Sequence, residues 1–252
     1  MLSFLRCLLL ASFLLLHAVP AIASDLCIMA EEYPPYSYHV DGEAKGLVVE
    51  LVKIIQERLG EHPSKIIFYP WARGYKKLQA GMGDVLFPMA MTPERSALFK
   101  FVGPVFWDDV YFYGRKGCRI ELKTVDDAKK VGMIAVTRDD VFHLNLVNMG
   151  FANLDVSSSQ VFDFMKLNKG RVALVPMGRK ALQYLGRQHP ELHVEELERL
   201  GPPVFFTTAY IAFAHKTPDE VIRKWQTVLD QLKSEGVWQE IMDRYFPPEP
   251  EK

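Results

Sequence analysis

The sequence predicts an α/β fold that contains a parallel sheet, with expected strands in three short apolar segments at residues 26–29, 65–70 and 84–90. Two segments whose apolar residues have helical spacing, 46–60 and 72–81, lie between these strands. Strands that alternate with helices form parallel sheets, and the loops at the carboxyl ends of such strands border a crevice. A ligand site is therefore expected at that edge of the sheet.

Each element has local signals of its own. The segment GLVVELVKIIQERLG (46–60) ends in a glycine, a residue that commonly terminates helices. KIIFYP (65–70) is then predicted as a strand, ARGYKKLQAG (72–81) as a short helix that Gly81 closes, and DVLFPMA (84–90) as the next strand. The order from residue 26 to residue 90 is thus strand, helix, strand, helix, strand.

Residues 1–23 are predicted to be a secretory signal peptide. Arg6 supplies one positive charge, an apolar run follows from residue 7 to 16, and the small residues at 21–23 suit a cleavage site. A membrane anchor is the alternative, but His17 and Pro20 leave the apolar run short of the roughly 20 residues that span a bilayer. The mature protein is therefore expected to be exported and soluble.

Composition excludes several classes of function. A formal net charge of -1 gives no electrostatic reason to expect nucleic-acid binding. Removal of the signal peptide leaves Cys27 and Cys118, for which two buried free thiols are preferred and a disulfide stays open. The 7 histidines and the cysteines lack metal-ligand spacing, so neither a metal nor another cofactor is expected. The mature length suits one large domain or two lobes.

The segment EEYPPYSY (31–38) places three tyrosines on a stretch that its prolines keep out of a helix. A tyrosine ring offers a flat apolar face and a polar tip, which suits the binding of a small molecule at a strand end. The alternative is a solvated turn with one or two rings tucked against the core.

The segment 84–106, DVLFPMAMTPERSALFKFVGPVF, contains a helix start directly after a strand. Thr92 offers a capping hydroxyl, Pro93 suits the first turn, and Glu94 lies near the positive end of the helix dipole. Arg95 follows at the expected crevice. A guanidinium beside free backbone N–H groups is a receptor for a carboxylate.

With these residues the chain resembles the periplasmic solute-binding proteins of amino-acid ABC transporters, the bacterial extracellular solute-binding proteins of family 3. The resemblance spans essentially the whole mature chain and includes EYPPYSY, GLVVELV, LQAGMGD, MTPER, FVGPV and the closing stretch that begins YIAFAHKTPDE. It implies a two-lobed type II periplasmic binding protein fold in which two crossing strands, near 107–113 and 203–210, form a hinge. Lobe one would comprise residues 24–110 and 206–252, the latter with the C-terminal helices, and lobe two residues 111–205.

The resemblance also implies which residues contact the ligand. Tyr33 falls where family members place a ring against the ligand, and Arg95 falls on the arginine that binds its α-carboxylate. The predicted ligand-binding residues are Tyr33, Tyr36, Trp71, Arg73, Ala90, Thr92, Arg95, Thr137, Arg138 and Gly178, and no catalytic residue is predicted.

Departures from the family pattern bear on the ligand. Gly178 stands where the family has the aspartate that binds the ligand ammonium, and Arg138 stands where a threonine is usual. Arg73, Arg95 and Arg138 together would give a cleft with three guanidiniums. The resemblance with these changes predicts an anionic or carboxylate-rich ligand.

Two alternatives within the cleft stay open. Glu31, Glu32 or Asp139 could replace the missing ammonium-binding acid, in which case basic amino acids would bind. Arg73 could instead be a structural residue paired with Glu31 or Glu50.

The function implied by the resemblance is that of a monomeric periplasmic protein that binds a small carboxylate ligand by hinge closure and delivers it to the membrane permease of an ABC transporter. A ligand sensor for a membrane receptor is an alternative. An enzyme is another, because periplasmic cyclohexadienyl dehydratase shares this fold, and Glu31 or Glu32 could serve as its acid.

Overall fold

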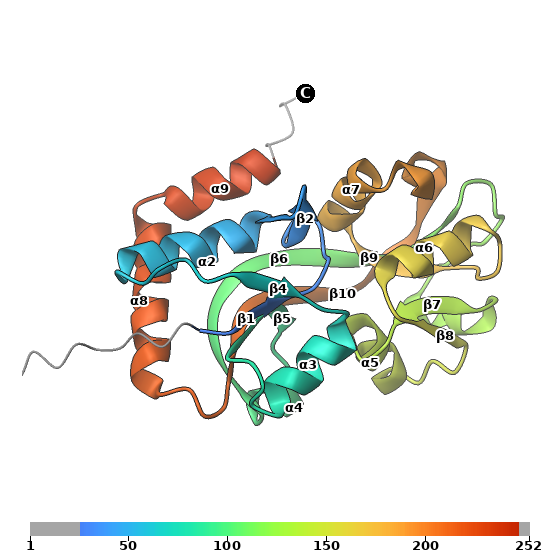
Figure 1. Ribbon diagram of the computed structural model, residues 1–252. Coiled ribbons are helices and arrows are strands. Elements are labelled where there is room, and N and C mark those ends of the chain that lie inside the picture. The colour runs from blue at the N-terminus through green and yellow to red at the C-terminus, as the bar shows by residue number, and fades with distance from the viewer. Residues whose placement is uncertain (1–25, 247–252) are drawn as a thin grey trace, which may run out of the picture.

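The computed structural model describes residues 26–246, so the predicted signal peptide lies outside the described residues. Its elements form two groups, lobe one and lobe two, which two long strands connect (Figure 1). Lobe one is built from both ends of the described chain: β1 (Ile28–Ala30), β2 (Tyr38–Val40), β3 (Glu43–Lys45), α2 (Leu47–Arg58), β4 (Ile66–Phe68), α3 (Trp71–Gln79), β5 (Val85–Ala90), α4 (Pro93–Ser96), α8 (Asp219–Ser234) and α9 (Val237–Tyr245).

Lobe two is built from the middle of the chain. Its regular elements are β7 (Ile134–Thr137), α5 (Val141–Asn148), β8 (Leu154–Ser157), α6 (Gln160–Asn168), β9 (Val175–Gly178) and α7 (Arg179–Gln188). Short 3-10 helices add to it at Val125–Lys130, Pro190–Leu192 and Val194–Glu196. The two-lobed α/β class predicted from the sequence is thus present in the structure.

The connecting strands are β6 (Phe99–Arg115) and β10 (Leu197–Ala214), which run side by side between the lobes (Figure 1). They pair antiparallel from Phe99 with Ala214 to Arg115 with Leu197. Both predicted crossings lie inside these strands, while the lobe boundaries at residues 110 and 205 stay predictions. Such a double ribbon can bend without breaking the chain connection, as hinges between domains do.

The main sheet has the order β4-β1-β5-β10-β6-β9. Strands β4, β1 and β5 are parallel, as predicted, whereas β10 is antiparallel to both β5 and β6, and β9 is antiparallel to β6. The pairing of β10 with β5 begins at Ala209, so the preceding residues 206–208 pair with β6 alone among the described strands. This leaves one edge of β10 unpaired where the strand passes between the lobes.

Helix α2 fixes the position of the tyrosine segment. Its Leu47 and Val48 amides donate to the carbonyls of Pro35 and Tyr36, both at 2.9 Å. Gly46 precedes the helix with φ 125, and a Cβ there would lie 2.5 Å from the Tyr36 oxygen. Only glycine therefore allows this close approach. The apolar face of α2 is buried, and each fully buried Leu or Ile contributes about 1.5–3 kcal/mol.

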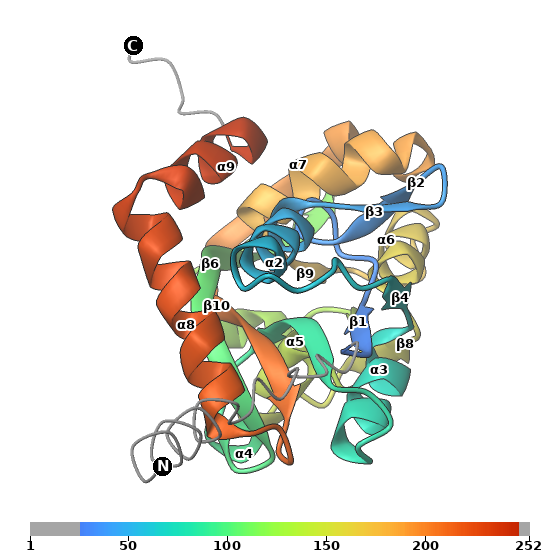
Figure 2. The same ribbon diagram turned by 60° about the vertical axis from the view of Figure 1, so that its left-hand side comes forward.

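Helices α8 and α9 cover one side of lobe one (Figure 2). Trp225 of α8 is fully buried, and its ring meets Phe213 of β10 edge-on with centroids 5.1 Å apart. Trp238 of α9 is also buried and donates from its indole to the Val105 carbonyl of β6 at 2.9 Å. The C-terminal helices are thus fastened to the strands that form the hinge.

Cys27 and Cys118 are both free thiols, and both are half-buried rather than fully buried. Within residues 26–246, none of the helices has the length and apolar character needed to cross a membrane.

Candidate functional site

The loops at the carboxyl ends of the parallel strands border a small cavity between the lobes. Its volume is about 40 Å³, which is room for about three water molecules. Of the predicted site residues, Tyr33, Trp71, Ala90 and Arg95 line it. The remaining lining residues come from both lobes and from β10: Glu31, Pro88, Phe106, Asp140, Val141, Phe142, Gln160, Thr207 and Ala209.

The two predicted tyrosines have different environments. Tyr33 lines the cavity, whereas Tyr36 is fully buried and stacks on Phe106 with ring centroids 3.5 Å apart. The Tyr36 hydroxyl donates to Asp108 Oδ2 at 3.3 Å, on β6. The loop therefore places one ring at the cavity and packs the other into the core.

Arg95 is held at the cavity by the helix start that the sequence predicts at Thr92 and Pro93. Thr92 caps α4 and accepts a hydrogen bond from the Arg95 amide at 3.3 Å, and Pro93 begins the helix. The side chain is 2 % exposed, with Nη1 donating to the Ala90 carbonyl at 3.1 Å. Its Nε is buried without a partner among residues 26–246. The guanidinium therefore keeps donors in reserve for a ligand.

A backbone carbonyl of lobe two accepts hydrogen bonds from lobe one beside the cavity. Asp139, with a left-handed φ of 59, presents its carbonyl to Arg95 Nη2 at 3.2 Å and to Trp71 Nε1 at 2.7 Å. The Trp71 ring also faces the guanidinium, 5.1 Å from Arg95 Cζ. The structure is thus a closed form in which a protein carbonyl occupies part of the hydrogen-bonding capacity of Arg95.

This contact leads to a first prediction. Trp71→Phe keeps a ring beside Arg95 but removes the indole donor to Asp139, a net loss of about 1 kcal/mol from the closed form. We expect the ligand-free variant to be more open, with a larger radius of gyration in small-angle scattering. Trp238→Phe is the matched control, because it removes the indole bond to Val105 and leaves the contact between the lobes intact. Equal radii for the two variants would contradict the prediction.

Two carboxyl groups share the cavity with Arg95. Burial raises the pKa of Glu31 well above its usual value and that of Asp140 to about 8, while the nearby Arg95 acts in the opposite direction on both. Asp140 also caps α5 by accepting from the His143 amide at 2.7 Å. Glu31 was one of the acids expected from the sequence, whereas Asp140 was missed. Its signal was an aspartate directly before a helical apolar pattern.

The structure does not bring Arg73 and Arg138 together with Arg95. Arg73 is exposed on α3 with its Cζ 5.2 Å from the Tyr69 ring centroid. Arg138 is exposed after β7 and donates its amide to the Ser157 carbonyl at 3.0 Å. The cavity contains a single guanidinium, so the expected cleft with three of them is not what the described residues form.

The alternative in which Arg73 pairs with Glu31 or Glu50 is not formed among residues 26–246 either. Glu50 instead accepts from Arg244 at 2.7 Å and from the Tyr245 hydroxyl at 2.6 Å. Thr137 is buried beside the cavity rather than lining it, and its hydroxyl donates to Asp163 at 2.8 Å. Thr92 acts as the α4 cap described above.

Gly178 lies against a carboxylate from a distant part of the chain. A Cβ at this position would lie 2.4 Å from Asp108 Oδ2. The same oxygen accepts from the Lys180 amide at 3.0 Å, so Asp108 caps the start of α7. Packing explains why residue 178 is a glycine, because the Asp108 carboxylate of β6 occupies the space that a side chain there would need.

The chain matches one protein family over all of its described residues. The model of the bacterial extracellular solute-binding proteins, family 3, matches residues 26–248. No curated protein matches the sequence.

Solved structures share the fold at low sequence identity. A P235GK mutant of ArgBP from T. maritima is 20% identical with a TM-score of 0.76, over 88% of this chain and 95% of that one. A histidine kinase sensor domain with similarity to periplasmic binding proteins is 19% identical with a TM-score of 0.78, over 87% and 96%. The GluR0 ligand-binding core from Nostoc punctiforme, in complex with L-glutamate, is 18% identical with a TM-score of 0.75, over 88% and 100%.

Proposed function

The chain belongs to family 3 of the bacterial extracellular solute-binding proteins, and from that premise we propose that it captures a small amino-acid-like solute by closing its lobes. We further propose that it acts in the periplasm as a monomer, after removal of residues 1–23, and delivers the solute to the permease of an ABC transporter. Membership of a family of extracellular solute-binding proteins supports the location and the role in solute capture, and the apolar run at residues 7–16 supports removal of the signal peptide.

The observation that carries the proposal is the charge arrangement in the cavity between the lobes. Arg95 offers a fork of donors that matches a carboxylate, and Glu31 and Asp140 offer acceptors for an ammonium group. A contact between opposite charges is worth about 4 kcal/mol at 4 Å and an effective dielectric near 20. A ligand with both groups therefore satisfies the site better than a ligand with either group alone.

This arrangement changes the ligand class expected from the sequence. The anionic preference depended on three guanidiniums and on the loss of an ammonium-binding acid at Gly178, whereas the cavity has one guanidinium and two carboxyl groups. We therefore propose a ligand that carries an ammonium group beside its carboxylate. The solved GluR0 ligand-binding core in complex with L-glutamate supports the view that this fold can enclose such a molecule.

The proposed mechanism uses the double ribbon of β6 and β10 as a hinge. In an open form the ligand first meets Arg95, Tyr33 and Trp71 on lobe one. Closure then brings Asp140 and Gln160 of lobe two onto the ligand, and the drier site strengthens each ionic hydrogen bond. The ligand carboxylate would replace the Asp139 carbonyl on Arg95.

A second candidate function rests on Glu31. Its raised pKa keeps a proton available at the cavity, as a general acid requires. An enzyme of the dehydratase type would change the mass of a bound ring carboxylate, whereas a binding protein or a sensor would release it unchanged. Mass spectrometry of ligand recovered after incubation separates these functions.

The test of the main proposal is calorimetric titration with amino acids of each charge type and with dicarboxylic and keto acids. Because Asp140 is protonated below about pH 8 in the closed form, an ammonium ligand must displace that proton on binding. We expect α-amino acids to bind with proton release near pH 7, and affinity to fall as the pH drops from 8 to 6. Tighter binding of keto acids, which lack the ammonium group, would contradict the proposed site.

A further inference from the structure

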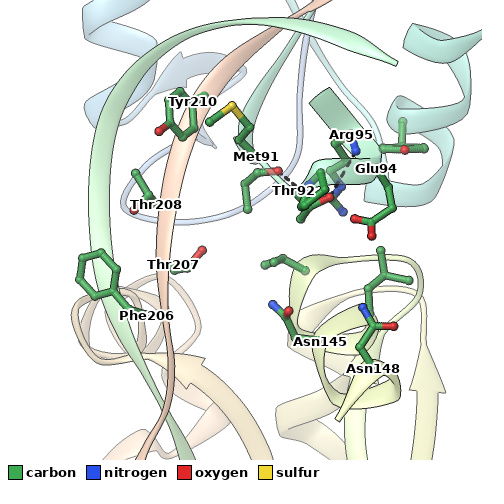
Figure 3. Close-up of a pocket in the computed structure, with 15 residues that line it drawn as sticks. Met91, Thr92, Glu94, Arg95, Asn145, Asn148, Phe206, Thr207, Thr208 and Tyr210 are labelled. Atoms are coloured by element: carbon green, nitrogen blue, oxygen red, sulfur yellow. Dashed lines mark hydrogen bonds between the residues drawn. The ribbon is translucent and has the colours of Figure 1, made fainter. Parts of the chain in front are cut away.

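A second and larger pocket opens between the lobes beside Arg95 (Figure 3). Its volume is about 630 Å³, within the range of about 300–1,000 Å³ that is usual for small-molecule sites. The polar residues that line it come from α4, α5 and β10 and include Thr92, Arg95, Asn145, Asn148, Thr207 and Thr208. Both lobes contribute, so the pocket changes shape when the hinge moves.

This outer pocket adjoins the cavity of the candidate site. Ala90, Arg95, Val141 and Thr207 line both. The inner cavity has a volume of about 40 Å³ in the closed form and the outer pocket about 630 Å³, so most of the space open to a ligand lies in the outer pocket. A ligand could therefore place an ammonium head in the inner cavity, beside Glu31 and Asp140, and most of its other atoms in the outer pocket.

The residues that line the outer pocket suit a ligand that contains peptide bonds and apolar groups. Asn145 and Asn148 supply side-chain amides, and Phe206 and Met91 are large apolar side chains that are 60% and 47% exposed. Residues 206–208 of β10 pair on one edge with β6 and leave the other edge unpaired among the described strands. An unpaired strand edge binds extended peptides through main-chain hydrogen bonds.

We propose that the outer pocket binds the trailing part of a short peptide, whose N-terminal ammonium lies beside Glu31 and Asp140 and whose first carbonyl accepts from Arg95. The next residue of the peptide then lies along the edge of β10, between Asn145 and Thr208. This assignment rests on the proposed function and replaces free amino acids by dipeptides among its amino-acid-like ligands. The first peptide carbonyl then takes the place on Arg95 that the carboxylate of a free amino acid would take.

The test compares each of the twenty amino acids X with its dipeptide X-Gly, by native mass spectrometry of the full mature protein and then by calorimetry on the best pair. We expect the best dipeptide to bind at least tenfold more tightly than its amino acid. The N-acetylated dipeptide should lose that gain, because it lacks the ammonium group.

Variants at the pocket complete the design. Asn148→Trp, at the exposed end of α5, is expected to weaken dipeptide binding at least tenfold by filling the pocket. Gln188→Trp is its matched control, because Gln188 is likewise an exposed amide at the last position of a helix, α7. Asn145→Trp repeats the test if the melting temperature shows that Asn148→Trp does not fold.

The outcomes separate this inference from the proposed function. Binding of an amino acid at least as tightly as every dipeptide would overturn the peptide assignment and leave the proposed function intact. Unchanged dipeptide affinity in folded Asn148→Trp and Asn145→Trp would also overturn it. Binding of neither class would overturn both.

Discussion

Arg95→Ala is expected to weaken ligand binding by about 2–5 kcal/mol, a loss of about 30-fold or more. The guanidinium is the single cation at the inner cavity among the described residues, and no neighbouring group can take over its fork of donors. Calorimetry with the tightest ligand measures the loss, and a thermal melt without ligand reports the packing that the side chain also supplies.

The matched control is Arg73→Ala. Arg73 is also an arginine that lies over an aromatic ring, that of Tyr69, but it is exposed and does not line the inner cavity. We expect that variant to bind normally. Arg95→Lys should recover part of the affinity, since it keeps the charge and lacks the bidentate fork. Equal losses from Arg73→Ala and Arg95→Ala would show that the carboxylate site is misplaced.

Gly178→Asp is expected to destabilise the protein by about 3 kcal/mol rather than restore the acid that family members have there. Its Cβ would lie 2.4 Å from Asp108 Oδ2, and the new carboxylate would lie beside an existing one that burial already disfavours. Urea unfolding of both proteins measures the difference in the free energy of unfolding.

A double-mutant cycle with Asp108→Ala isolates the contact. Asp108→Ala alone removes the cap on α7 and the acceptor of the buried Tyr36 hydroxyl, and should cost about 2 kcal/mol. In the double variant the added aspartate no longer meets a carboxylate, so the two effects should not add. Additive losses would mean that the two positions do not touch, and would leave Gly178 without a packing reason.

Most elements of lobe one could be predicted from local sequence patterns. Of its topology, only the parallel pairing of β4, β1 and β5 could be predicted in this way. Helical spacing located α2 and α3, and short apolar runs located β1, β4 and β5. The pattern could not show that β10 enters the sheet antiparallel beside β5, because pairing of residue 209 with residue 90 depends on the whole chain path. The β2–β3 hairpin was also missed, although Asp41-Gly42 at its turn is a recognised signal.

The candidate site divides in the same way. Arg95 and its cap at Thr92 lie in one short motif, so the sequence locates them together. The positions of Arg73 and Arg138 depend on which side of an element faces the cleft, and a motif does not contain that information. The contact of Asp108 with Gly178 and the meeting of Glu31 with Asp140 join residues far apart in the sequence, so only the fold shows them.

Because lobe one is built from both ends of the chain, the order in which the chain emerges affects the order in which its lobes can fold. Elements β7 to β9 are contiguous and precede α8 and α9 in the chain, so all of them have emerged before those two helices do. The hinge strand β10 and the buried Trp225 of α8 come after all of lobe two, so the apolar face that Phe213 and Trp225 close in lobe one stays uncovered until then. Lobe two can therefore gain its compact form while lobe one is still an open intermediate, and the C-terminal helices set the moment at which the protein becomes able to clamp a ligand.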